Sequence, residues 1–213
     1  KAALKVPADG YIVANVGGKN MSAVLDGVAA TVVDYTKEDV PELKLIGEFN
    51  KMNARAAIAA AKAFAPDLAN TIIYDSVSSF QGSWRRFEYK GRSKTGAEVY
   101  DDYAHHPTAV RETIHGIRQK FPGKKVVVAF HPHLYSRTRD LMAEFARAFD
   151  GADRVLLAPI YAAREAPLEG VSSEVLEARI AAERPGLAAA LPTFDTIQET
   201  LERESDPDTI IVT

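Results

Sequence analysis

Three polar segments of the sequence carry side chains that could do chemistry. DDYAHHP (101–107) combines two acids, a tyrosine and two histidines, and HPHLYSRTR (131–139) adds two histidines and two arginines. IYAAREAP (160–167) contributes a tyrosine, an arginine and a glutamate. Imidazole and carboxylate groups suit proton transfer or metal binding, whereas guanidinium groups suit phosphate and carboxylate ligands. These residue types predict one wall of a ligand pocket.

Two other interpretations of these segments are open. A metallohydrolase site is one, because the ligand types that zinc prefers are present in Asp101, Asp102, His105, His106, His131 and His133. Arg137 and Arg139 argue against it, since guanidinium groups would repel a cation and suit an anion. We therefore assign no metal ligand. The other interpretation is structural: Asp101 or Asp102 completes the cap of a helix, and the histidines are incidental.

Each polar segment follows a β-like run. EVY (98–100) precedes the first segment, VVVAF (126–130) the second and RVLLAP (154–159) the third. In open parallel sheets, ligands bind at the carboxyl ends of the strands, where loops lead into helices. We therefore expect the three segments to share one rim of a sheet.

Strand and helix patterns alternate from residue 83 to the end of the chain. RRFEYKGRSKTGAEVYDDY (85–103) predicts a β-hairpin around a glycine-containing turn, and TIIVT (209–213) predicts a last strand. Helices are expected at about 107–121, 136–149, 173–183 and 195–204. Ser172 or Ser173 would cap the third of them. This alternation predicts a doubly wound α/β domain of Rossmann-like topology over 83–213.

A separate unit is predicted for residues 1–82. The patterns indicate, in this order, a strand at 10–16, a short helix at 20–27, a strand at 29–35, an alanine-rich helix within 46–66 and a helix near 68–79. The alanine-rich helix should end before Pro66, because proline cannot continue a helix. Gly82 marks the expected boundary, since the pattern restarts after it.

The composition argues against several classes of protein. The chain has 213 residues, of which 46% are hydrophobic and 26% charged, as in an ordinary globular α/β protein. Its net charge is −3 and its basic residues form no stripe, which argues against nucleic-acid or membrane partners. It contains no cysteine and no apolar run of membrane-spanning length. GGKN (17–20) does not fit a phosphate loop, and no GxGxxG or GxSxG motif occurs.

The order of five segments resembles the ATP-dependent Mur ligases of peptidoglycan synthesis: GEFNKMNARAA, FQGSWRRFE, VYDDYAHHPT, FHPHLYSRT and LAPIYAARE. The resemblance is greatest to the members that join L-alanine to UDP-N-acetylmuramate through an acyl phosphate. It implies a cytoplasmic enzyme that uses ATP and Mg²⁺. Residues 1–82 would be the C-terminal part of the central ATP-binding domain, and 83–213 the amino-acid-binding C-terminal domain.

The resemblance also implies roles for individual residues at the nucleotide. Asn50 and Asn53 match the two asparagines of a motif at the nucleotide site, and Arg86 matches an arginine that reaches toward ATP. Asp102 matches an acid that hydrogen-bonds the ribose. Arg86 and Asp102 are accordingly expected to act in catalysis. An ordinary capping role is the alternative for the two asparagines.

Three further residues are implied to act at the incoming amino acid. Tyr103 and His105 match positions close to it, with His105 counted among the catalytic residues, and Arg137 matches an arginine suited to clamp its carboxylate. The histidines would then orient an amino acid and bind no metal. Other Mur ligases, such as the enzyme that recycles tripeptide, and a non-catalytic nucleotide- or amino-acid-binding module are the alternative functions.

The sequence departs from the family pattern at two positions. Phe49 stands where histidine is usual, which suggests stacking on adenine, and Leu134 stands where many relatives have arginine. The segment between the second strand and the alanine-rich helix is short for this family. The phosphate loop and the magnesium ligands are expected upstream of Lys1, so the 213 residues alone are expected to be inactive. No oligomeric state is predicted.

Overall fold

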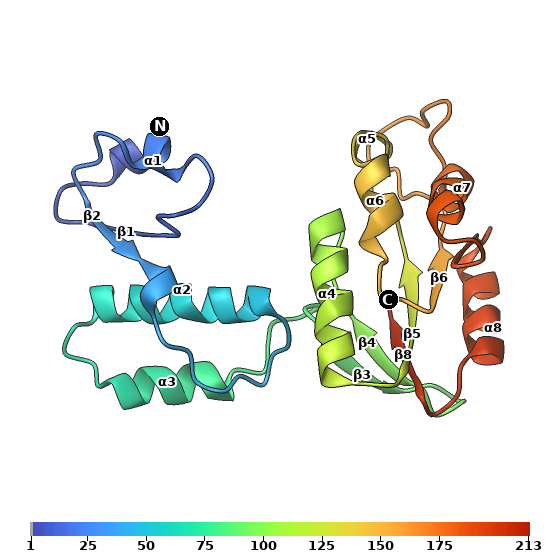
Figure 1. Cartoon of the computed structure of the whole chain (residues 1–213), viewed down its shortest axis with the longest axis horizontal. Helices are drawn as coiled ribbons and strands as arrows, with labels where there is room; N and C mark the ends of the chain where they lie inside the picture. Colours follow the sequence, from blue (N-terminus) through green and yellow to red (C-terminus); the bar gives the residue numbers. More distant parts are fainter. Residues whose placement is uncertain (1) are drawn as a thin grey trace. The chain divides into compact units, whose positions relative to one another are not determined.

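The computed structural model describes residues 2–213 and divides into two compact units. The first ends at Gln81 and the second begins at Gly82 (Figure 1). Each unit has its own sheet and its own buried side chains, so each is described by itself.

The first unit is built on two parallel strands and two long helices. In chain order its elements are a 3₁₀ turn Ala3–Lys5, β1 (Tyr11–Ala14), α1 (Met21–Leu25), β2 (Thr31–Asp34), a 3₁₀ turn Tyr35–Lys37, α2 (Glu48–Phe64) and α3 (Asn70–Ser79). β1 pairs with β2, and α2 packs against both strands and against α3. Ile58 and Ile73 are buried between these elements. The strands and helices predicted for this part of the chain are therefore confirmed.

The second unit contains a six-stranded sheet. Its spatial order is β3 (Glu88–Arg92), β4 (Glu98–Asp101), β8 (Thr209–Val212), β5 (Lys125–Phe130), β6 (Arg154–Leu157) and β7 (Ala188–Ala190). β3 pairs antiparallel with β4 as the predicted hairpin, and all other pairs are parallel. β7 is not predicted by the sequence pattern, because three alanines favour a helix and have low β-propensity. Pairing with β6 determines their conformation instead.

Helices cover both faces of this sheet. α4 (Pro107–Lys120), α6 (Met142–Ala148) and α7 (Ser173–Glu183) pack in sequence against one another, and α8 (Phe194–Glu204) belongs to the opposite face (Figure 1). Right-handed crossovers explain this division, because β4 to β7 advance across the sheet in one direction and the connection through α8 returns to β8. The predicted doubly wound α/β fold is confirmed.

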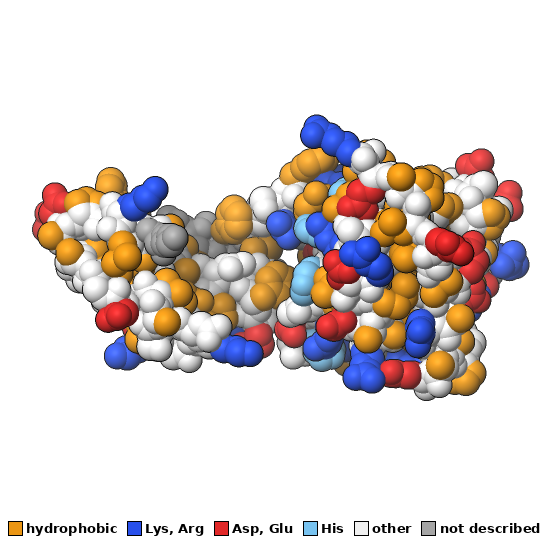
Figure 2. Space-filling view, turned by 90° about the horizontal axis from the view of Figure 1, so that it is seen from above, with side chains coloured by type: hydrophobic (Ala, Val, Ile, Leu, Met, Phe, Trp, Pro, Cys, Tyr) orange, Lys and Arg blue, Asp and Glu red, His pale blue; other side chains and the backbone are white. Residues whose placement is uncertain are grey.

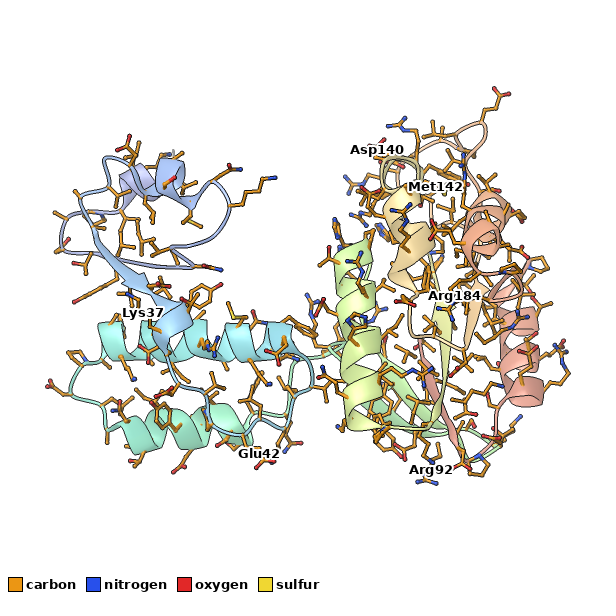
Figure 3. All side chains as sticks on the ribbon, in the orientation of Figure 1. Lys37, Glu42, Arg92, Asp140, Met142 and Arg184 are labelled. Carbon is orange, nitrogen blue, oxygen red and sulfur yellow. The ribbon has the colours of Figure 1, made fainter. Side chains whose placement is uncertain are left out.

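The prediction of one helix over 136–149 is wrong. The structure has α5 (Tyr135–Asp140) and α6, separated at Leu141, whose φ of −114° and ψ of 19° leave the helical region. Figure 3 labels Asp140 and Met142 on the two sides of the break. Tertiary contacts explain it: Phe145 of α6 packs on Phe130, whereas a neighbouring loop holds the start of α5.

α8 begins with a local cap that can be tested. The Thr193 hydroxyl accepts a hydrogen bond from the Thr196 amide at 3.1 Å, and the Thr196 hydroxyl accepts one from the Thr193 amide at 3.2 Å. Thr193→Ala should lower the free energy of unfolding by about 1 kcal/mol in urea denaturation. Glu199→Ala, an exposed position of the same helix, is the control and should change it by less than about 0.5 kcal/mol. Equal losses would show that the cap is not the cause.

Candidate functional site

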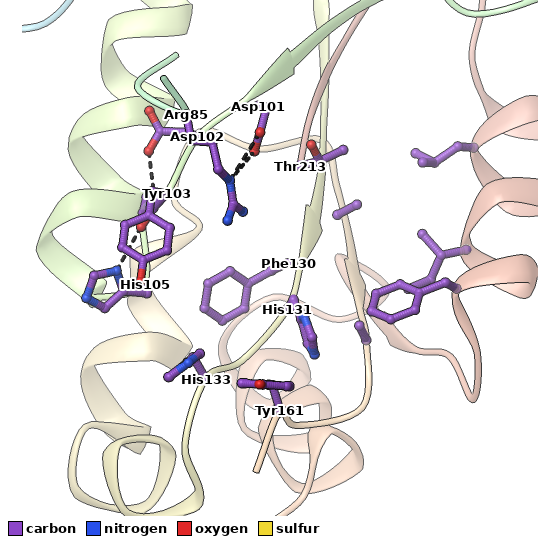
Figure 4. A pocket seen from close by; sticks show the side chains of 16 residues that line it. Arg85, Asp101, Asp102, Tyr103, His105, Phe130, His131, His133, Tyr161 and Thr213 are labelled. Atoms are coloured by element: carbon purple, nitrogen blue, oxygen red, sulfur yellow. Dashed lines mark hydrogen bonds and ion pairs between the residues drawn. The ribbon is translucent and has the colours of Figure 1, made fainter. Parts of the chain in front are cut away.

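A cavity of about 540 Å³ lies at the carboxyl ends of β4, β5 and β6 (Figure 4). Its polar side is lined by Arg85, Asp101, His105, His131, His133 and Tyr161. Its apolar side comes from Phe194, Ile197 and Leu201 of α8. Parts of all three polar segments therefore meet at one rim, as expected from their positions after the strands. Figure 2 shows histidine side chains at the surface of this unit among basic and acidic ones.

Asp102 stabilises the turn that leaves β4. One carboxylate oxygen accepts a hydrogen bond from the Phe87 amide at 2.9 Å, and the other accepts one from the Ala104 amide at 2.8 Å. The Asp102 amide itself donates to the Thr213 carbonyl at 2.9 Å. Burial raises the pKa of Asp102, and the two amide hydrogen bonds oppose this rise. Asp102 therefore links two parts of the chain. One is the segment 85–87, which contains Arg86, and the other is the end of β4.

Two adjacent arginines flank the ring of Tyr103. The guanidinium carbon of Arg85 lies 5.1 Å from the ring centroid and that of Arg86 lies 5.8 Å from it, within cation–π range. Arg85 also pairs with Asp101, at 3.2 Å between Nε and Oδ2. In the described part of the chain, Arg86 forms no ion pair and its side chain no hydrogen bond.

Arg85, which is not among the predicted site residues, lines the cavity, whereas Arg86 does not. The doublet RR was the available signal, but it does not say which arginine faces the rim. The backbone decides this, because Arg85 and Phe87 have positive φ values of 54° and 50° and so turn the segment.

The two neighbouring histidines of the first segment have different surroundings. Nδ1 of His105 lies 2.8 Å from the Tyr103 carbonyl, and its ring meets the Tyr103 ring edge-on. The His106 side chain accepts a hydrogen bond from the Thr108 amide at 3.3 Å and is the N-cap of α4. The helix cap is therefore His106, and the suggestion that Asp101 or Asp102 supplies it is wrong.

The second segment contributes an aromatic wall. The His131 ring lies edge-on to Tyr161 and to Phe194, and His133 packs on Tyr161 (Figure 4). Burial lowers the pKa of His131 and of His133, and the nearby Arg137 lowers that of His133 further. Both imidazoles are therefore neutral at pH 7, when they can donate through one ring nitrogen and accept through the other.

Arg137 reaches the rim through His133. Its Nη1 atom lies 3.3 Å from the His133 carbonyl oxygen, to which it donates, and 3.4 Å from His133 Nδ1. No carboxylate lies within ion-pair distance of Arg137 among residues 2–213, whereas Arg139 of the same helix pairs with Asp140 at 2.7 Å. Arg137 does not line the cavity itself. Its guanidinium is therefore available to an anion beside the cavity.

Asn50 and Asn53 lie on α2 of the first unit. Asn50 donates from its side-chain amide to the Ile46 carbonyl at 2.8 Å, and Asn53 is exposed. Neither is the N-cap of α2, which is Gly47. The Phe49 ring covers Gly47, where an added Cβ would come within 2.8 Å of a ring carbon. The other predicted residues, Arg86, Asp102, Tyr103, His105 and Arg137, all belong to the second unit.

The structure also bears on the metal and membrane interpretations. Within residues 2–213, no group of three or more His, Asp or Glu side chains is arranged to hold a metal ion. The six residues considered as zinc ligands therefore give the metallohydrolase interpretation no geometric support. None of the helices described is both long enough and apolar enough to cross a membrane.

Comparisons with family models and with curated proteins point to the same family. The family model for the Mur ligase, glutamate ligase domain, matches residues 85–213. The UDP-N-acetylmuramate–L-alanine ligase of Cytophaga hutchinsonii is 46% identical over 143 residues, which cover 67% of this chain and 30% of that protein. The chain thus spans about a third of the length of the curated relatives it matches.

Solved structures agree on the fold. The UDP-N-acetylmuramate–alanine ligase from Thermotoga maritima aligns with a TM-score of 0.63 at 24% identity, over 80% of this chain and 35% of that one. A murein peptide ligase from Psychrobacter arcticus aligns with a TM-score of 0.67 at 21% identity, over 99% of this chain and 49% of that one. Because the family model matches more than half of its residues, the chain belongs to the Mur ligase family.

Proposed function

We propose that this chain is part of a cytoplasmic ligase that joins L-alanine to UDP-N-acetylmuramate with ATP and Mg²⁺. The observation that carries the proposal is a cavity at the strand ends flanked by Arg86 and Arg137, two guanidinium groups without a carboxylate partner in the described chain. An acyl-phosphate ligase needs cations of this kind for phosphate and for the amino-acid carboxylate. The 46% identity to an alanine ligase supports this choice of substrates.

The reaction makes two demands on the protein. The γ-phosphoryl group of ATP passes to the muramate carboxylate, and the alanine amine then attacks the acyl carbon and releases phosphate. Both steps build charge on phosphate oxygens, so positioning and charge stabilisation are the main tasks. Magnesium, when bound, would neutralise part of the phosphate charge.

The residues of this chain fit these tasks. Arg86 would contact the ATP phosphates, and Asn50 and Asn53 would contribute to the nucleotide site from the first unit. Each Asp102 oxygen accepts one amide hydrogen bond and keeps a lone pair that would accept a further hydrogen bond from a ribose hydroxyl. Tyr103 and His105 would line the amino-acid site. Arg137 would clamp the amino-acid carboxylate.

The experiment is titration of the 213-residue chain with L-alanine, followed by NMR. Wild-type protein should show shifts at the amides of 131–139, and Arg137→Ala should weaken binding about 10- to 100-fold, because charge-assisted hydrogen bonds are lost. Arg139→Ala is the matched control, since Arg139 pairs with Asp140, and it should bind like wild type. Equal affinity of the Arg137→Ala protein would contradict the proposed clamp.

An activity assay separates the ligase from a binding module. An intact protein that contains this chain should form UDP-N-acetylmuramoyl-L-alanine and ADP from the three substrates. Alanine binding without any product would indicate a non-catalytic amino-acid-binding module. Product formation with tripeptide in place of alanine would indicate the recycling enzyme.

A further inference from the structure

α5, the helix that carries Arg137, has no side-chain cap from its own N-cap residue. Its N-cap position is Leu134, which has a positive φ of 74° and a side chain that cannot accept a hydrogen bond. The helix is six residues long and is separated from α6 at Leu141. So short a helix gains little from its own hydrogen bonds, and its first amides need outside acceptors.

Glu165 supplies the missing cap from the loop that follows β6. One of its carboxylate oxygens accepts a hydrogen bond from the Ser136 amide at 2.9 Å, and the other accepts one from the Ser136 hydroxyl. These hydrogen bonds lower the pKa of Glu165, so its carboxylate is ionised at neutral pH. A negative charge at this end of a helix is also favoured by the helix dipole. The contact joins residues 29 positions apart in the sequence.

The loop that carries Glu165 is itself attached to the segment before α5. The Leu134 amide donates to the Tyr161 carbonyl at 2.9 Å, and the Tyr161 amide donates to the Pro132 carbonyl at 2.8 Å. The Glu165 amide donates to the Ala162 carbonyl at 2.9 Å, which closes the loop on itself. Glu165 is therefore held in place by backbone hydrogen bonds that do not depend on its side chain.

We propose that Glu165 is a positioning residue for Arg137, acting through Ser136 and the first turn of α5. It touches no ligand in this role. Its cap keeps the first turn helical, and the turn directs the Arg137 guanidinium toward His133 and the rim. Without the cap the turn frays, and ordering Arg137 on binding costs more conformational entropy. The inference rests on the proposed role of Arg137 as the carboxylate clamp.

Amide hydrogen exchange on the 213-residue chain tests the cap independently of function. In Glu165→Ala, exchange at the Ser136 and Thr138 amides should become about fivefold faster, as for loss of an N-cap. Glu165→Gln, which keeps one acceptor oxygen, should give a smaller change. The control is Glu169→Gln, since Glu169 lies exposed in the same loop and its side chain forms no hydrogen bond or ion pair among the described residues. Unchanged exchange in Glu165→Ala would overturn the cap.

Alanine affinity tests the positioning role. Glu165→Ala should weaken L-alanine binding about three- to tenfold. Its melting temperature should be about the same as that of the Glu169→Gln control. In an intact ligase the KM for L-alanine should rise by a similar factor, with kcat changed less than twofold. Ser136→Ala, which removes only the hydroxyl contact, should show a smaller rise in KM.

The two measurements give distinct outcomes. Faster exchange with unchanged alanine affinity would overturn the positioning role and leave the proposed function intact. Failure of an intact ligase that contains this chain to bind alanine would overturn the proposed function, and the positioning role with it. The exchange rates would then still decide whether Glu165 caps α5.

Discussion

Arg86→Ala is expected to lower kcat/KM for ATP by about 10²- to 10³-fold in an intact ligase that contains this chain, as for loss of one preorganised donor to a charged transition state. Arg86 lies between two residues of positive φ, Arg85 and Phe87. The Asp102 carboxylate holds the Phe87 amide, and the Tyr103 ring lies under the Arg86 guanidinium. The side chain is thus positioned before any phosphate binds, and no carboxylate in residues 2–213 lies within ion-pair distance of it.

Two further variants separate charge from geometry in this prediction. Arg86→Lys keeps the charge but loses the planar, forked donors, so it should recover only part of the rate. Arg92→Ala is the control, because Arg92 is an exposed residue of β3 that pairs with Glu98 at 3.3 Å. Steady-state rates at varied ATP give the answer. Near-wild-type kcat/KM for Arg86→Ala would remove Arg86 from the proposed site.

Phe145→Ala should lower the free energy of unfolding by about 3–5 kcal/mol, the usual cost of a large-to-small change in a core. The Phe145 side chain is 2% exposed, and its ring centroid lies 5.4 Å from that of Phe130. Phe130 also meets Phe149 edge-on at 5.3 Å. The substitution therefore leaves a cavity beneath the end of β5, from which His131 and His133 extend.

Urea denaturation followed by circular dichroism measures this loss. Phe194→Ala is the comparison in the same unit, because Phe194 is 61% exposed and should cost less than about 1 kcal/mol. The Phe145→Ala protein that stays folded should also bind alanine more weakly, since the end of β5 loses its support. Equal stability losses for the two phenylalanines would contradict the packing argument.

Most of the fold follows from local patterns in the sequence. VVVAF became β5 and RVLLAP contains β6, because continuous apolar runs suit strands that are buried on both faces. The predicted cap at Ser172 is confirmed by a hydrogen bond from the Val175 amide at 3.3 Å. The two failures, β7 and the break at Leu141, are places where tertiary packing overrides local helix propensity.

Local sequence patterns identify the segments that form the candidate site, because a polar segment after each strand must lie at the carboxyl edge of a parallel sheet. Which side chains meet there depends on the tertiary structure. It placed Arg85 in the cavity and left Arg86 beside it, used both oxygens of Asp102 to hold a turn, and joined Glu165 to Ser136. These contacts depend on backbone φ values and on pairing between residues far apart in the chain, and neither leaves a periodic signal in the sequence.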